Sequence, residues 1–149
     1  MIIRANLKMI NFLSTIKNDQ IHDELNAVIN SIISNVKLIK NCTIYDTDNI
    51  TDEDVNLDTV LKYVGDLTGY EMGCNEFRFE NTGDIPFLTV ATYFLSQLKK
   101  KFAERIFVVY VLVENDVFFV RFHTFRKNEG IWLNENLEQY ENAVMYAMN

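Results

Sequence analysis

The chain has 149 residues, of which 48% are hydrophobic and 23% are charged, and its formal net charge is −7 at pH 7. This length is typical of one domain with a single core, so we expect one domain over residues 1–149. The negative charge argues against direct nucleic-acid binding, because phosphate contacts need lysine and arginine. Since no stretch has the apolar length of a signal peptide or a membrane span, we expect a cytoplasmic protein that does not bind membranes.

The first half of the chain is predicted to be helical. Leucine and isoleucine at three-residue intervals predict a short helix over residues 5–17. A longer helix is expected over residues 19–39, with Asn18 or Asp19 at its start. Its apolar residues follow the spacing of one helical face: Ile21, Leu25, Val28, Ile29, Ile32, Ile33 and Val36. A third helix, ending near Gly65 or Gly69, is indicated by Val55, Val60, Leu61, Val64 and Leu67.

The second half is predicted to supply most of the strands. Residues 75–80 alternate between apolar and charged side chains, as a half-buried strand does. A helix restarts at residues 84–86, because an aspartate and a proline suit the first turn, and its apolar stripe extends to Phe102. Residues 106–125 change to a period of two, and a short last strand is expected over residues 143–146.

The period-two segment is predicted to be a hairpin with Asn115 and Asp116 as its tight turn. That turn makes one face apolar, since it places Val113 opposite Phe118, Val111 opposite Val120 and Val109 opposite Phe122. The other face is mixed, with Tyr110 opposite Arg121 and Val108 opposite His123. The element order predicts an α+β fold in which N-terminal helices pack on a mainly antiparallel sheet of about four strands. We expect the second face of this sheet to be only partly protected.

No catalytic or metal-binding motif stands out. His22 and His123 are the only histidines, and neither has a serine or cysteine nearby in a pattern typical of a nucleophile. Cys42 and Cys74 lack the short paired spacing of zinc ligands. The segment 46–54 lacks the central glycine of a calcium loop and leads to a leucine where the glutamate ligand belongs, and the glycine-rich loops that bind nucleotides are absent. We therefore expect no cofactor, no metal and no enzymatic activity.

A run of acidic residues is the most unusual feature of the middle of the chain. Residues 41–90 hold eleven acidic and two basic side chains, a net charge of −9. Six of the acids lie within thirteen residues with no basic residue between them: Asp46, Asp48, Asp52, Glu53, Asp54 and Asp58. One interpretation is a solvated loop leading into a helix whose N-terminus favours negative charge. The other is a docking surface for a basic partner, since clustered charge of one sign speeds association.

A second group of polar residues lies between Phe118 and Leu133. Arg121, His123 and Arg126 are close together there, and Trp132 is the only tryptophan. A small enzyme or nucleic-acid-acting protein built on the Arg121, His123 and Arg126 cluster is one hypothesis. A contact patch for a partner is another, because tryptophan and arginine are enriched at binding hot spots. For Trp132 itself, a position in the core is favoured over an interface.

The C-terminal residues 120–146 resemble the end of small immunity proteins from bacterial polymorphic-toxin and contact-dependent growth inhibition systems, the TriTu-type group in particular. Three features carry the resemblance: an apolar strand that ends Phe122-His123-x-x-Arg126, the segment Glu129-Gly130-x-Trp132-Leu133, and Leu137-Glu138-x-Tyr140-Glu141 before the last strand. These features cover about a fifth of the chain.

The resemblance implies a cytoplasmic protein without catalytic activity that binds one cognate toxin domain and neutralises it. In the TriTu-type group the toxin resembles a tRNA-cleaving nuclease, with elongation factor Tu implicated in its action. A nuclease presents basic groups to RNA, so an acidic inhibitor has complementary charge. The expected toxin contacts are therefore the acidic run from Asp46 to Asp58 together with Arg121, His123 and Trp132. An unspecified binding module, or one encoded by a phage, is the remaining alternative.

Overall fold

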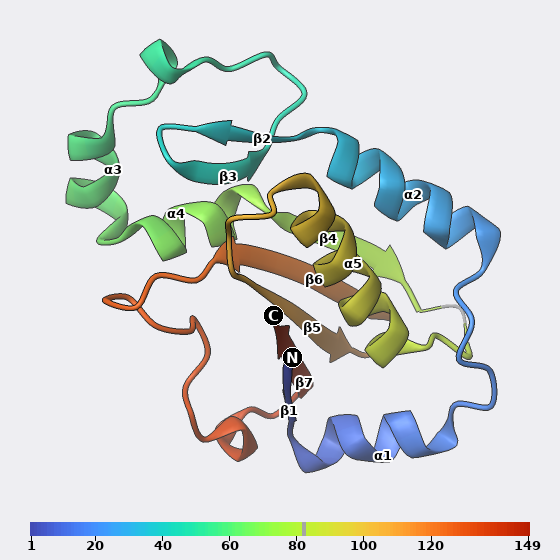
Figure 1. The fold of residues 1–149 in the computed structure, drawn as a ribbon. Helices are drawn as coiled ribbons and strands as arrows, with labels where there is room; N and C mark the ends of the chain where they lie inside the picture. The colour runs from blue at the N-terminus through green and yellow to red at the C-terminus, as the bar shows by residue number, and fades with distance from the viewer. Residues whose placement is uncertain (82) are drawn as a thin grey trace.

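The main element of the fold is a five-stranded sheet (Figure 1); the computed structural model describes residues 1–81 and 83–149. Its strands are β1 (Ile2–Ala5), β4 (Glu76–Glu80), β5 (Phe107–Glu114), β6 (Val117–Thr124) and β7 (Ala143–Met148). They lie in the order β1-β7-β5-β6-β4, and each neighbouring pair is antiparallel. A separate two-stranded sheet contains β2 (Val36–Ile39) and β3 (Cys42–Tyr45). The α+β class is confirmed, but the prediction of about four strands was too low.

The hairpin of β5 and β6 forms as predicted around Asn115 and Asp116. Asn115 has a φ of 53°, in the left-handed region that tight two-residue turns require. The register pairs Val113 with Phe118, Val111 with Val120 and Val109 with Phe122, which confirms the predicted apolar face. The alternation of side chains therefore fixes which face of the main sheet enters the core.

Three helices cover that apolar face: α1 (Leu7–Thr15), α2 (Asp23–Ser34) and α5 (Phe87–Lys101). Figure 1 shows α5 lying across the sheet, with α1 and α2 nearer its margins. Phe94 of α5 and Phe122 of β6 have no exposed surface, and both belong to one core cluster with Met9 of α1 and Ile29 of α2. The prediction that N-terminal helices pack on the sheet is thus confirmed, with a later helix at its centre.

The helix predicted over residues 19–39 is wrong at both ends. It begins at Asp23, and it stops at Ser34, where the Asn35 N–H bonds back to the last carbonyls of the helix. The apolar residues that follow belong to β2, which turns back into β3 through Lys40 and Asn41. These two residues have φ values of 44° and 68°, the conformation of a two-residue hairpin turn. A short apolar run does not distinguish helix from strand by its spacing, so the prediction extended the helix.

The third predicted helix is two helices, α3 (Leu57–Val64) and α4 (Leu67–Cys74). Gly65, with a φ of 103°, ends α3, and the Asp66 side chain accepts a hydrogen bond from the Gly69 N–H to start α4. We call residues 36–74, which contain β2, β3, α3 and α4, the side lobe. It has its own small core, in which Ile39, Cys42, Ile44 and Val55 are buried.

The second face of the main sheet is better protected than predicted. Val108, Tyr110 and Val144 on this face have no exposed surface. They pack against Met72 of α4 and against Leu133 and Leu137 of the segment that connects β6 to β7, which includes a short 3-10 helix, η2 (Leu137–Gln139). Among the described residues, no helix has both the length and the apolar character needed to cross a membrane.

Candidate functional site

The acidic run lies on the side lobe, between β3 and α3, and Asp46 at its start faces inward. Only 4% of Asp46 is exposed. Its carboxylate lies 2.6 Å from Lys37 Nζ and accepts hydrogen bonds from the backbone N–H groups of Asp48 and Ile50. The bond from Lys37 holds the pKa of this carboxyl below its usual value. Asp46 therefore shapes the loop from within and cannot contact a partner in this conformation, contrary to the sequence prediction.

Asp52 and Asp54 are exposed, and they also hold the loop together. Asp52 accepts a hydrogen bond of 2.7 Å from the Lys40 N–H of the β2–β3 turn. Asp54 accepts bonds from the backbone N–H and the hydroxyl of Thr51, closing the first turn of the 3-10 helix η1 (Asp52–Asp54). The bond from the Thr51 N–H lowers the pKa of Asp54. The contacts of Asp52 and Asp54 therefore agree with the first interpretation of the acidic run, a solvated loop that leads into a helix.

The remaining acids of the run, Asp48, Glu53 and Asp58, are exposed. None of their carboxylates hydrogen-bonds or ion-pairs with another side chain or backbone group among residues 1–81 and 83–149. Glu53 and Asp58 line a shallow pocket of about 290 Å³ together with Lys40, Val55, Asn56 and Leu57. This part of the side lobe thus presents carboxylates whose charge is free to act on a partner.

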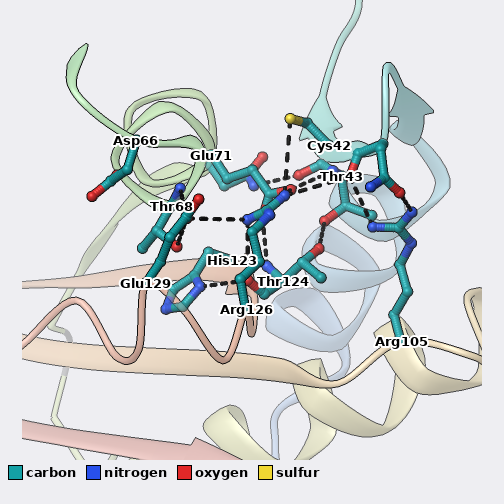
Figure 2. A network of polar contacts seen from close by, with 12 residues as sticks. Cys42, Thr43, Asp66, Thr68, Glu71, Arg105, His123, Thr124, Arg126 and Glu129 are labelled. Atoms are coloured by element: carbon teal, nitrogen blue, oxygen red, sulfur yellow. Dashed lines mark hydrogen bonds and ion pairs between the residues drawn. The ribbon is translucent and has the colours of Figure 1, made fainter. Parts of the chain in front are cut away.

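A buried carboxylate, Glu71 on α4, joins the side lobe to the main sheet (Figure 2). Glu71 has no exposed surface. One of its oxygens accepts bonds of 2.7 Å from the Thr43 N–H of β3 and from the Arg126 guanidinium, and the other accepts a bond of 2.5 Å from the Thr124 N–H of β6. One side chain on α4 therefore binds both β3 and the end of β6, and its charge is paired with Arg126.

Asn75, at the end of α4, reinforces this junction. Its side chain accepts a bond from the Tyr45 N–H and donates to the carbonyls of Thr43 and Phe122, so it bridges β3 and β6. The Thr43 and Thr124 hydroxyls lie 2.7 Å apart beside it. Because these groups are buried and satisfied, the side lobe is held at a defined position on the sheet.

His123 lies in the interior on the second face of the sheet. Its Nδ1–H donates to the Thr124 carbonyl, which leaves Nε2 to accept a bond of 2.8 Å from the Tyr110 hydroxyl; Tyr110 in turn accepts from the Trp132 N–H. Burial lowers the pKa of His123 to about 4. With no exposed surface and both nitrogens bonded, His123 cannot reach a substrate or a partner, which removes it from the predicted contacts.

Arg121, which is half-buried, and Trp132, which is exposed, form a cation–π pair. The Arg121 guanidinium lies 5.1 Å from the centre of the Trp132 ring and ion-pairs with Glu76 on the neighbouring strand β4. Trp132 is 42% exposed, so the favoured core position is wrong, although its ring still packs edge-on against Tyr110. The structure thus brings Arg121, His123 and Trp132 together as predicted and leaves Arg121 and Trp132 accessible. The acidic run lies apart from them, on the side lobe.

The chain matches the family described as the Uncharacterized protein PM0498 family over residues 4–149. It belongs to this family. Comparison with curated proteins and comparison with solved structures gave no match.

In this PM0498-family protein, the polar residues that organise the side lobe were missed by sequence reasoning. Glu71 was one of eleven acids in its region and was not singled out. A signal was present, because Thr68, Glu71, Met72 and Asn75 have the i, i+3, i+4, i+7 spacing of one helical face, and all four prove to be buried. A buried helical face that contains polar residues indicates a helix whose side chains hydrogen-bond to groups in the protein interior.

The cysteines of this PM0498-family protein are both free thiols. Burial raises the pKa of Cys42 to about 11, so its thiolate is scarce at neutral pH. Within the described parts of the chain, no group of three histidine, cysteine or acidic side chains is placed to hold a metal ion.

Proposed function

We propose that this PM0498-family protein is an immunity protein that binds a basic toxin nuclease, a tRNA-cleaving toxin of a contact-dependent inhibition system, and neutralises it. The observation that carries the proposal is the set of exposed carboxylates of Asp48, Glu53 and Asp58, which have no partner among the described residues and stand on a lobe fixed by buried hydrogen bonds. The resemblance of residues 120–146 to immunity proteins supplies the kind of partner. The protein acts by association in the cytoplasm.

Fixed charges suit this task for two reasons. A nuclease carries basic groups where RNA phosphates bind, and an acidic surface attracts those groups over a distance of about 8 Å at physiological salt. Because the Glu71 and Asn75 junction holds the side lobe in place, little conformational freedom is lost when the partner arrives. A protective complex needs a Kd in the nanomolar range or below, which corresponds to about −12 kcal/mol.

The proposed function also predicts which gene lies next to this one. A toxin and its immunity protein must be inherited together, so the gene next to this one should encode the C-terminal end of a very large secreted protein. That C-terminal domain is the probe for the binding experiments below. Housekeeping genes on both sides would contradict the proposal.

Neutralising the three free carboxylates is expected to slow binding. The triple variant Asp48→Asn, Glu53→Gln, Asp58→Asn should associate with the toxin domain about 10-fold or more slowly, and the dependence of its association rate on salt should be shallower. Association rates measured by stopped-flow fluorescence from low to high salt provide the test. Folding should be nearly unchanged, since these carboxylates are exposed and Asp58 contributes at most about 1 kcal/mol at the α3 N-terminus.

A matched control keeps the change in net charge the same. Glu104→Gln, Glu114→Gln, Glu135→Gln also removes three exposed carboxylates, but from outside the side lobe. It should reduce the association rate far less. Equal effects of the two triple variants would mean that only net charge matters and would remove the acidic run from the interface.

A further inference from the structure

Helix α3 carries an apolar stripe that the protein covers only in part. Leu57, Val60, Leu61 and Val64 have the i, i+3, i+4, i+7 spacing that normally faces a core. Leu57 and Val60 pack against the core of the side lobe, but Leu61 is 44% exposed, Val64 is 49% exposed, and no residue of α3 is fully buried. The stripe is therefore covered at the start of the helix and uncovered at its end.

An aromatic residue adds to this uncovered region. Tyr63 in the same turn is 77% exposed, the largest exposure among the chain's described large hydrophobic residues. Leu61 and Val64 share one face of α3 and Tyr63 lies on the adjoining side, and we call these three residues the α3 apolar patch. Three large apolar groups exposed at the end of one short helix suit a contact with a partner, and tyrosine is among the residues most enriched at binding hot spots.

The surroundings of the patch are acidic, which favours a binding partner with basic groups around its contact site. Asp58 in the first turn of α3 and Asp66 just after its end are exposed, and Glu53 lines the adjoining pocket. Lys62 is the one basic side chain within α3. A second copy of this chain is a poor occupant, because it would bring together two regions that each carry eleven acidic and two basic residues over positions 41–90.

We propose that the α3 apolar patch is the anchor of the docking surface and inserts into an apolar depression with a basic rim on the toxin nuclease domain. This inference rests on the proposed function and specifies its interface: the acids steer the partner, and Leu61, Tyr63 and Val64 hold it. The division follows the usual anatomy of interfaces, in which a few buried apolar anchors supply affinity and charged residues at the rim govern the rate of association.

The test compares truncations on α3 with truncations elsewhere. Tyr63→Ala and the double variant Leu61→Ala, Val64→Ala should each raise the Kd for the toxin domain encoded by the neighbouring gene about 30-fold or more, mainly through faster dissociation. The control is Leu7→Ala, Val28→Ala, which removes comparably exposed apolar groups, 59% and 47% exposed, from α1 and α2. The control should change the Kd less than about 2-fold.

A second measurement does not depend on truncation. A photo-crosslinking phenylalanine derivative at position 63 should attach to the toxin domain on illumination, whereas the same group at position 28 should not. Unchanged affinity of both α3 variants, with no crosslink from position 63, would overturn the anchor while leaving the proposed function intact. A crosslink from position 63 to a second copy of the chain would also overturn the anchor. A wild-type protein that fails to bind the toxin domain would remove the proposed function and the anchor together.

Discussion

Replacing Glu71 with alanine is expected to lower the free energy of unfolding by about 3–5 kcal/mol. The substitution leaves the Arg126 guanidinium, whose side chain is only 12% exposed, without its 2.7 Å carboxylate partner. It also leaves the backbone N–H groups of Thr43 and Thr124 without acceptors in the interior. Because Glu71 links β3 to the end of β6 through these donors, the loss should loosen the attachment of the whole side lobe to the sheet.

Urea unfolding measures the loss of free energy, and thermal unfolding measures the accompanying fall in Tm. At this chain length, each kcal/mol lowers the Tm by about 2–4 °C, so Glu71→Ala should melt about 10 °C below the wild type. Glu104→Ala removes an exposed carboxylate and should change stability by less than about 0.5 kcal/mol. The Glu71→Ala, Arg126→Met double variant should be more stable than the sum of the two single losses implies, by about 1–3 kcal/mol. Strict additivity would contradict the assignment of Glu71 and Arg126 as a coupled pair.

Acidification from pH 7 to 4.5 is expected to cost the protein about 2–3 kcal/mol through His123 alone. In the unfolded chain a histidine has a pKa of about 6.5 and takes up a proton across this range. In the folded protein burial lowers the pKa of His123 to about 4, so the ring stays neutral. The unfolded state therefore binds more protons, and stability falls as the pH drops from about 6.5 towards 4.

Burial is the main reason that His123 resists a proton, and the hydrogen bond from Tyr110 to Nε2 acts in the same direction. A proton on Nε2 would face the Tyr110 hydroxyl, which already accepts from the Trp132 N–H and would have to turn its own hydrogen away. His123→Gln should be less stable than the wild type at pH 7, yet lose much less stability between pH 7 and 4.5. The pH window excludes most of the titration of Asp46 and Asp54, whose pKa values lie below the usual 3.8. A variant with the same pH slope as the wild type would show that His123 is not the titrating group.

The elements that were predictable from sequence are those whose determinants are local. The β5–β6 hairpin follows from alternating side chains and the turn at Asn115 and Asp116, so its register was predicted residue by residue. Strand β1 is different, because it pairs with β7 at the other end of the chain, Ile2 opposite Met148. The residues near β1 in the sequence give no indication that β1 pairs with β7. The β2–β3 hairpin was hidden by apolar residues that continue the spacing of α2.

Some features of the candidate site were likewise predictable from the local sequence, and others were not. The acidic run was visible because charge can be counted in a sequence. The sequence does not show which of these carboxylates point outward. Asp46 is buried and Asp48 is exposed, although both are aspartates, because the path of the loop decides their direction. Trp132 was misplaced because its exposure depends on the path of the segment that covers the second face of the sheet. Glu71 acts through contacts with residues 28 to 55 positions away, a range that helical spacing does not report.

Neutralisation of the toxin is the most direct test of the proposed function. The C-terminal domain encoded by the neighbouring gene should be incubated with tRNA and elongation factor Tu, with and without an equimolar amount of this protein. We predict that the domain cleaves tRNA on its own, that cleavage stops when the protein is present, and that the two proteins elute together as a 1:1 complex. Cleavage that continues undiminished with the protein in excess would contradict the account.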